Sequence, residues 1–396
     1  MKTSSRPKLT KTISKVVIAS LVILVILFYG IGGLYFSGQI DKLGLNAKDT
    51  RQTNVTLDLK IAAVTKSTIT LAVNPQSLSE VSTAGVWGLI WNNGYGQITT
   101  ILAHNHVDAT RSFRIILGTP PKPGQMAAID SRAFPGNPRQ GLGLNFSNVY
   151  YRGPLGNYPA WLIPAKSSTW AITVHGNGMT RRDGLKILPV LHQMGLPVLM
   201  ITYRNDLGAP ASKSGLLRYG LTEWKDLQAS VTYALQHGAK HIVLVGLSMG
   251  GGIVTNLLLQ SPLRTYVSAV ILDAPMLNFS QTVDYEASEL TIPGLGVPIP
   301  QSLTDVAKWI AGIEYGVKWS QLDYLTKVKT LTTPILLFQG LADKTVPPIT
   351  SSQLAVALPK LVTYITTPNA GHLESWNLNP TRYNDYVRSF LTRLHI

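Results

Sequence analysis

The sequence predicts an α/β fold in which a mostly parallel sheet is covered by helices on both faces. Continuous apolar runs, typical of strands buried on both faces, recur along the chain at 148–151, 160–163, 170–174, 196–202, 242–245, 269–272, 335–338 and 361–365. Helical candidates lie between the later runs, at 221–236, 253–260, 351–358 and 382–394. Because right-handed crossovers join parallel strands, the carboxyl ends of the strands, and any site, should lie along one edge of the sheet.

The segment 53–143 has a different pattern and predicts a β-rich N-terminal module ahead of the α/β domain at 144–396. Apolar and polar residues alternate with a period of two at 57–61 and 68–72, as expected of strands with one buried face. Three aromatic residues of this module should pack against the α/β domain, with a sugar-stacking surface as the alternative: Trp87, Trp91 and Tyr95.

The N-terminus predicts a membrane anchor. A basic tail, residues 1–15, precedes an uncharged apolar run over 16–36. About 20 helical residues at 1.5 Å each cross a hydrocarbon core of about 30 Å. The run is longer than that of a typical signal peptide and ends on a poor cleavage sequence, although a cleaved signal peptide is the alternative. The basic tail should stay in the cytoplasm, so that a linker over 37–52 and the rest of the chain lie outside the cell membrane.

Composition narrows the classes of protein further. The 396 residues are 45% hydrophobic and only 14% charged, which is typical of a folded globular chain. The sequence contains no cysteine, which excludes disulfides, thiolate metal sites and a cysteine nucleophile. The net charge of +15 comes without a dense basic run interleaved with aromatic residues, so we expect no nucleic-acid partner.

The stretch VGLSMGGG, at 245–252, places one serine between an apolar run and a helical candidate. Gly246, Ser248 and Gly250 match the pattern G-x-S-x-G, in which the serine sits on a strained strand-to-helix turn that exposes its hydroxyl. Glycines on either side let the strand and the helix pass closely. Ser248 is therefore a candidate nucleophile; a glycine turn with an incidental serine is the alternative.

A serine hydroxyl needs a base and an orienting carboxylate to become a good nucleophile. His372 follows the last apolar run and Asp343 follows the run before it, so both can reach the same edge of the sheet. The chain order Ser248, Asp343, His372 is the order expected with this kind of turn. Asp273, at the end of the run 269–272, is the rival acid.

A fourth element is the stretch 171–178, an apolar run that continues into His175 and Gly176. Such a strand end can present a backbone N–H to a developing oxyanion, and the N–H of Met249 would be the other donor. We expect His175 to shape this loop and not to act as the base. We also expect Arg204 and Asp206 to brace a loop beside the site.

These residues together resemble the α/β-hydrolase family, over about residues 149–396. Five segments are similar to its serine-aminopeptidase and prolyl-oligopeptidase-like branch: Tyr203-Arg204-Asn205-Asp206, Asp226, GLSMGG, LADKTVP and NAGH. The resemblance implies Ser248 as nucleophile with Asp343 and His372 as its partners. It also implies Asn177 and Met249 as the N–H donors of the oxyanion hole. Because the branch includes esterases, lipases, thioesterases and peptidases, the resemblance leaves the substrate open.

The segment 277–331 is longer than a simple crossover and predicts a small lid insertion. An apolar loop at 290–300 precedes a helical pattern that begins near Ser302 and includes Trp309 and Ile313. We expect the apolar face of this lid to line an acyl or aryl pocket. Simple packing on the domain is the alternative.

The sequence thus predicts a membrane-anchored serine hydrolase that cleaves carboxylic esters or related acyl substrates through an acyl-enzyme. Its partners would be a small acyl substrate and the membrane, and this chemistry needs no metal or organic cofactor. A serine peptidase of the same fold is one alternative. A non-catalytic cell-surface binding protein is another, and the oligomeric state stays open.

Overall fold

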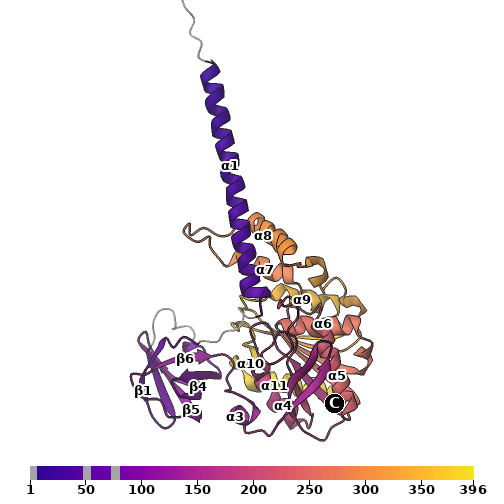
Figure 1. The fold of residues 1–396 in the computed structure, drawn as a ribbon. Coiled ribbons are helices and arrows are strands. Elements are labelled where there is room, and N and C mark those ends of the chain that lie inside the picture. Colours follow the sequence, from indigo (N-terminus) through magenta and orange to yellow (C-terminus); the bar gives the residue numbers. More distant parts are fainter. Residues whose placement is uncertain (1–6, 48–54, 73–80) are drawn as a thin grey trace, which may run out of the picture.

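The computed structural model describes residues 7–47, 55–72 and 81–396, which form three parts (Figure 1). A long N-terminal helix, α1 (Pro7–Ile40), extends away from the rest of the chain. A small β-barrel and a larger α/β domain lie side by side at the carboxyl end of this helix. The predicted order of a β-rich module followed by an α/β domain is therefore confirmed.

The α/β domain is built on one sheet of eight strands in the order β14-β13-β12-β11-β9-β10-β8-β7. Their bounds are β7 (Ser147–Gly153), β8 (Gly156–Ile163), β9 (Thr169–Val174), β10 (Val198–Ile201), β11 (His241–Leu247), β12 (Val267–Asp273), β13 (Ile335–Gly340) and β14 (Val362–Thr367). From β10 to β14 all neighbours pair in parallel, whereas β8 is antiparallel to both β7 and β10. The sheet is thus mostly parallel, as predicted.

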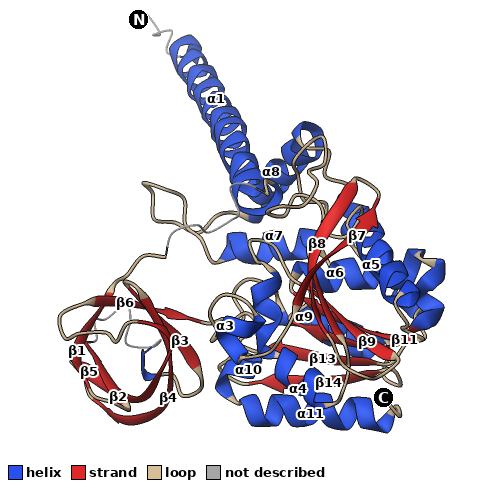
Figure 2. Cartoon of the chain, turned by 60° about the horizontal axis from the view of Figure 1, so that its bottom comes forward, coloured by secondary structure: helices blue, strands red, loops and turns tan. Residues whose placement is uncertain are grey.

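Helices cover both faces of this sheet (Figure 2). They are α3 (Pro138–Leu142), α4 (Leu188–Gln193), α5 (Trp224–Gln236), α6 (Met249–Gln260), α7 (Phe279–Ser288), α8 (Gln301–Glu314), α9 (Pro348–Ala357), α10 (Ser375–Leu378) and α11 (Pro380–Arg393). Short 3-10 turns lie at η2 (Arg181–Lys186), η3 (Pro262–Tyr266), η4 (Trp319–Leu322) and η5 (Val328–Thr330).

Successive side chains of the central strand β11 enter two different apolar cores. Ile242 and Leu244 pack into the core that contains α5 and α6, while Val243 and Val245 pack into the core that contains α4 and α11. Because side chains alternate across a strand, a strand with both faces covered reads as one continuous apolar run. This explains why the runs in the sequence mark the central strands.

The N-terminal module is a closed barrel with the strand order β1-β2-β5-β4-β3-β6. Its strands are β1 (Leu59–Val64), β2 (Thr68–Ala72), β3 (Trp87–Trp91), β4 (Gly94–His104), β5 (Asp108–Gly118) and β6 (Met126–Asp130). Trp87 and Trp91 are buried in the barrel's own core, so the expectation that they pack on the α/β domain is wrong. Tyr95 contacts that domain, where the Arg182 guanidinium lies 5.3 Å from its ring centre, and Leu378 of the domain packs against the barrel core.

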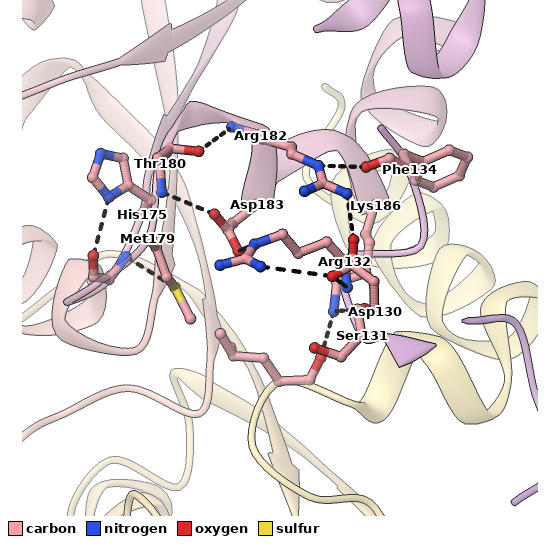
Figure 3. Close-up of polar contacts among 12 residues, drawn as sticks. Asp130, Ser131, Arg132, Phe134, His175, Met179, Thr180, Arg182, Asp183 and Lys186 are labelled. Atoms are coloured by element: carbon pink, nitrogen blue, oxygen red, sulfur yellow. Dashed lines mark hydrogen bonds and ion pairs between the residues drawn. The ribbon is translucent and has the colours of Figure 1, made fainter. Parts of the chain in front are cut away.

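A polar network joins the barrel to the α/β domain (Figure 3). Asp130, at the end of β6, pairs with Arg182 of η2, and Arg132 pairs with Asp183 at 3.0 Å. A second junction lies at Val86 and Asn377, whose backbone N–H and C=O groups meet at 2.8 Å. Since the 3-10 turn η2 directly follows the loop after β9, the barrel supports one border of the candidate site.

Helix α1 continues beyond the range expected of the anchor. It runs to Ile40 and is followed by a short π-helix, η1 (Asp41–Leu45), so the first part of the expected linker at 37–52 is helical. Asn46 then forms a β-bridge with Leu216 of the α/β domain. By length and apolar composition, 15–45 is the one stretch in the described part of the chain that could cross a membrane.

Arg111 on β5 is a fully buried cation that holds the segment 81–85, directly before β3, in place. Its guanidinium donates hydrogen bonds to four backbone carbonyls: those of Val81, Thr83, Gly85 and Thr99. Burial lowers the pKa of Arg111 to about 10, so the group stays charged at neutral pH. Three of the four carbonyls precede β3, so the guanidinium fixes the path of the chain into that strand.

We expect Arg111→Met to destabilise the protein by about 2–4 kcal/mol, because it leaves four carbonyls without this donor. The measurement is the urea midpoint of the detergent-solubilised full chain. Arg114→Met is the matched control, since Arg114 lies on the same strand and is exposed. Equal midpoints for the two variants would contradict the role given to Arg111.

Candidate active site

Ser248 occupies a strained turn between β11 and α6. Its backbone has φ 53° and ψ −121°, a conformation that residues other than glycine rarely adopt. A Cβ at Gly250 would lie 2.2 Å from the Val174 carbonyl oxygen, and one at Gly246 would lie 2.8 Å from the Gly250 carbonyl oxygen. The two glycines of the motif are therefore required by the close passage of α6 over β9 and β11.

The structure brings the three predicted residues into one hydrogen-bonded chain. His372 Nε2 lies 2.9 Å from Ser248 Oγ, and His372 Nδ1 lies 2.8 Å from Asp343 Oδ2. The carboxylate accepts from Nδ1–H, which leaves Nε2 free to accept the serine proton. These residues follow β11, β13 and β14, and so meet at the carboxyl edge of the sheet.

The Asp343 side chain is held in place by groups other than His372. Its Oδ1 accepts hydrogen bonds from the backbone N–H groups of Thr345 at 2.8 Å and Val346 at 2.9 Å. The side-chain amide of Gln339 donates to Oδ2 at 3.2 Å. The carboxylate is fully buried, and these three hydrogen bonds hold it toward His372.

Asp273, the rival acid, occupies a different environment. Its Oδ2 accepts a hydrogen bond from the Tyr383 hydroxyl at 3.1 Å. Burial raises the pKa of Asp273 to about 6, although the Lys186 ammonium opposes that shift. In the described part of the chain no hydrogen bond joins Asp273 to His372, so Asp343 is the better candidate for the orienting acid.

Asn177 lies in the loop after β9 and lines the same cavity as Ser248 and Met249. Met249 is the first residue of α6, so its N–H is one of the helix's unsatisfied donors. A Cβ at Gly176 would lie 2.8 Å from the Cβ of Ser248, which shows how closely this loop passes the serine. The two expected oxyanion donors therefore lie on either side of the candidate nucleophile.

His175 braces this loop, as the sequence predicted. Its Nε2 lies 2.9 Å from Asp206 Oδ2, and its Nδ1 lies 3.0 Å from the Gly176 carbonyl oxygen. Burial alone would lower the pKa of His175, but the Asp206 carboxylate raises it above its usual value. Arg204, which was expected to brace a loop beside the site together with Asp206, pairs with Asp226 of α5 at 2.7 Å.

A cavity of about 250 Å³ opens beside Ser248 and His372 and is mostly apolar. The α/β domain contributes apolar side chains from β12's following loop, α7, α8 and the connection between these helices: Met276, Phe279, Val283, Ala287, Leu290, Ile299 and Ala307. An apolar cavity that ends at an activated serine suits an acyl or aryl group. The insertion at 277–331 therefore lines the pocket as predicted.

The exposed face of α8 differs from the expectation. Trp309 and Ile313 are 67% and 66% exposed and do not line the cavity, whereas Thr304 and Ala307 do. Helix α8 has two neighbours, because Ala307 faces the domain and Val306 packs against α1. The third side of the helix, which carries Trp309, is left uncovered.

The end of α1 forms one wall of the cavity, a feature that the sequence did not indicate. The lining residues from this segment are Phe36, Gln39, Ile40, Leu43 and Gly44. The Asn177 side-chain amide also lies 3.3 Å from the Leu43 carbonyl oxygen and 3.4 Å from that of Gly44. An apolar N-terminal run predicts a span but does not reveal the surface against which its end packs.

Glu286 is the only carboxylic acid among the residues that line this cavity. Burial raises its pKa to about 7, and the charge of Asp343 acts in the same direction while His372 opposes it. Below pH 7 the carboxyl group is therefore mostly neutral and above pH 7 mostly ionised. No sequence pattern indicates this position, because a glutamate on a lid helix is usually solvated.

Comparisons with known proteins agree with this architecture. The model of the alpha/beta hydrolase family matches residues 171–386, more than half of the chain. An uncharacterized protein of Mycobacterium tuberculosis is 25% identical over 239 residues, which cover 59% of this chain and 74% of that protein.

Solved structures are similar in fold. The Pyrococcus furiosus esterase Pf2001 is 20% identical with a TM-score of 0.52, and the match covers 65% of this chain and 96% of that one. A second crystal form of the same esterase is 19% identical with a TM-score of 0.50, covering 66% and 94%.

The geometry predicts that Asp343→Asn lowers kcat by about three to four orders of magnitude, because the amide would hold the wrong imidazole tautomer. Asp273→Asn should change kcat much less, since that carboxylate bonds Tyr383. Both variants should keep the wild-type circular dichroism spectrum. A larger loss in Asp273→Asn than in Asp343→Asn would reverse the assignment of the acid.

The raised pKa of Glu286 predicts that the hydrolysis of substrates with long acyl chains depends on pH. As pH rises through about 7 the carboxyl group ionises, and an acyl chain then has to pack beside a charge. We expect the ratio of kcat/KM for Glu286→Gln to that of the wild type to rise between pH 6 and pH 8. Glu289→Gln, on the exposed surface beside Lys344, is the control. A ratio that is constant over this range would show that Glu286 does not control acyl binding.

Proposed function

The chain belongs to the α/β-hydrolase family, and from the geometry of its site we propose that it is a serine hydrolase of carboxylic esters. One observation carries this proposal: the hydrogen-bonded chain Asp343–His372–Ser248 ends on a strained turn that opens into an apolar cavity. A serine with this environment is activated for attack on an acyl carbon.

The proposed reaction runs in two steps. Ser248 Oγ attacks the ester carbon while His372 takes its proton, and the backbone N–H groups of Asn177 and Met249 stabilise the oxyanion. His372 then gives the proton to the leaving alcohol, which leaves an acyl group on Ser248. Water activated by His372 hydrolyses this acyl-enzyme, and Asp343 holds the imidazole in the required tautomer throughout.

Esters are favoured over peptides by the lining of the cavity. Most of its exposed wall is apolar, which suits an acyl chain better than a peptide backbone, although Gln39, Tyr219, Thr282, Thr304 and Thr345 add polar groups. A serine peptidase is the second candidate, because the Glu286 carboxylate is suitably charged to hold a substrate ammonium group. A binding protein without catalysis is disfavoured. The strained backbone at Ser248 costs about 1–3 kcal/mol of folding free energy, and binding alone would gain nothing from it.

For its location, we propose a single-pass anchor with the N-terminus in the cytoplasm and the hydrolase domain outside. The support is the apolar helix at 15–45 and the basic residues that precede it. A cleaved signal peptide is disfavoured by the packing of the same helix, because its carboxyl end forms a wall of the cavity.

The test is hydrolysis of p-nitrophenyl esters of increasing acyl length by the detergent-solubilised full chain. Wild type should show kcat/KM rising about threefold to fourfold per methylene until the cavity is full, and Ser248→Ala should be inactive. Ala307→Leu, which fills part of the cavity, should shorten the preferred chain.

Trp309→Ala is the matched control on the same helix and should leave the preference unchanged, because Trp309 lies outside the cavity. Activity that survives in Ser248→Ala would contradict the proposed nucleophile. Hydrolysis of peptide amides faster than of any ester would favour the peptidase instead.

A further inference from the structure

The active-site cavity and the apolar N-terminal helix are parts of one structure. Five cavity-lining residues, Phe36, Gln39, Ile40, Leu43 and Gly44, belong to the end of α1 and to η1. Two further lining residues, Thr304 and Ala307, belong to α8. The cavity beside Ser248 therefore adjoins the line along which α1 and α8 pack.

Helices α1 and α8 are in close contact along that line. Gly33 is buried, and a Cβ there would lie 2.6 Å from Cγ1 of Val306. One turn earlier, the Tyr29 hydroxyl is 2.8 Å from that of Ser302, and one turn later the Ser37 hydroxyl donates to Glu314 at 3.2 Å. The contact with α8 thus extends over residues 29–37 of α1.

If α1 crosses a bilayer, its length determines how deep α8 lies in that bilayer. The apolar residues that precede this contact, 16–28, rise only about 20 Å at 1.5 Å per residue. A hydrocarbon core is about 30 Å thick, so about seven further residues are needed to cross it. Those residues are the ones that contact α8, and α8 consequently lies beside the outer part of the hydrocarbon core and its border with the headgroups.

The surface of the lid is apolar at that same level. We name as the apolar rim five exposed residues of α8 and of the connection before it: Leu290, Leu295, Val297, Trp309 and Ile313. Figure 1 shows this connection and α8 on the side of the domain from which α1 extends, while the barrel lies beside the domain. Aliphatic and Trp side chains in such a position suit insertion about 5–10 Å into an interface.

From these observations we propose that the substrate is an acyl ester of a bilayer lipid, which enters the cavity from the outer leaflet beside the packed helices α1 and α8. The proposal rests on the proposed hydrolase function and names its substrate class. Its occupant is the lipid bilayer itself, because the apolar rim continues the apolar surface of α1, where Ile31, Leu34 and Tyr35 are also exposed. An acyl chain that moves from the leaflet into the cavity then stays in apolar surroundings.

The chemical step balances with water as the only co-reactant. The bond between Ser248 Oγ and the acyl carbon forms as the ester C–O bond breaks, and His372 transfers the serine proton to the alcohol oxygen of the lipid. Water then cleaves the acyl-serine bond. The products are a fatty acid, which can return to the leaflet, and a lipid with one free hydroxyl.

The test compares one enzyme on two substrates. The full chain is reconstituted in phosphatidylcholine vesicles that carry a diacylglycerol with one fluorescent acyl chain, and p-nitrophenyl butyrate serves as the water-soluble ester. The double variant Trp309→Glu/Ile313→Glu changes the apolar rim and leaves the cavity lining intact. Val107→Glu is the matched control, because Val107 is 69% exposed in the barrel.

We expect wild type and Val107→Glu to hydrolyse both substrates. The double variant should lose about tenfold or more on the vesicle-borne ester, since two apolar side chains no longer insert, and should keep its rate on p-nitrophenyl butyrate. That retained rate also shows that the variant is folded.

Two results would overturn the proposal: hydrolysis of the vesicle-borne ester by the double variant at the wild-type rate, or wild type that cleaves only p-nitrophenyl butyrate. Equal losses on both substrates would likewise overturn it, because the rim would then support the fold and not lipid entry. Failure of wild type on both esters would instead contradict the proposed hydrolase function on which this inference rests.

Discussion

The passage of α6 across the end of β9 is the constraint on which the candidate site depends. A side chain at Gly250 would collide with the Val174 carbonyl, so the helix can begin where it does only because that position has no Cβ. The turn that results holds Ser248 at positive φ and places it directly before the N-terminus of α6. The same approach places the loop after β9 beside the serine, so nucleophile and expected oxyanion donors are positioned together.

The surroundings of this turn are held by groups that arrive from distant parts of the chain. Asp206 and His175 fix the loop after β9 from one side. From the other side, the carbonyls of Leu43 and Gly44 lie within hydrogen-bonding distance of the Asn177 amide. The segment that follows the apolar helix therefore contacts the very residue whose backbone is expected to bind the oxyanion. The end of the apolar helix, the cavity and the loop after β9 are therefore connected through the side chain of Asn177.

Sequence patterns were sufficient for the central fold and for the expectation that the candidate residues meet at one edge of its sheet. Ser248, Asp343 and His372 each follow an apolar run, and parallel strands bring such positions to one edge. The same patterns failed for Trp309, because helical spacing groups it with Val306 although the two face different neighbours. Periodicity reports that a helix has apolar faces, but the number of partners decides which face is buried.

The role of α1 in the cavity and the carboxyl group of Glu286 were also beyond a sequence-based prediction. An apolar run of about 20 residues reads as a span whatever its end contacts. Glu286 gains its raised pKa from the surrounding cavity walls and from Asp343, which lies 57 positions later in the chain. Both features depend on tertiary packing between segments far apart in the sequence, and no local sequence pattern indicates that these segments meet.

The central claim is that Ser248 is an activated nucleophile. Mass spectrometry after reaction of the folded full chain with a fluorophosphonate tests it most directly, because only an activated serine reacts quickly. The account predicts one adduct per chain, located on Ser248 and formed much more slowly in His372→Ala. An adduct on another residue, or no adduct on the folded wild-type protein, would contradict it.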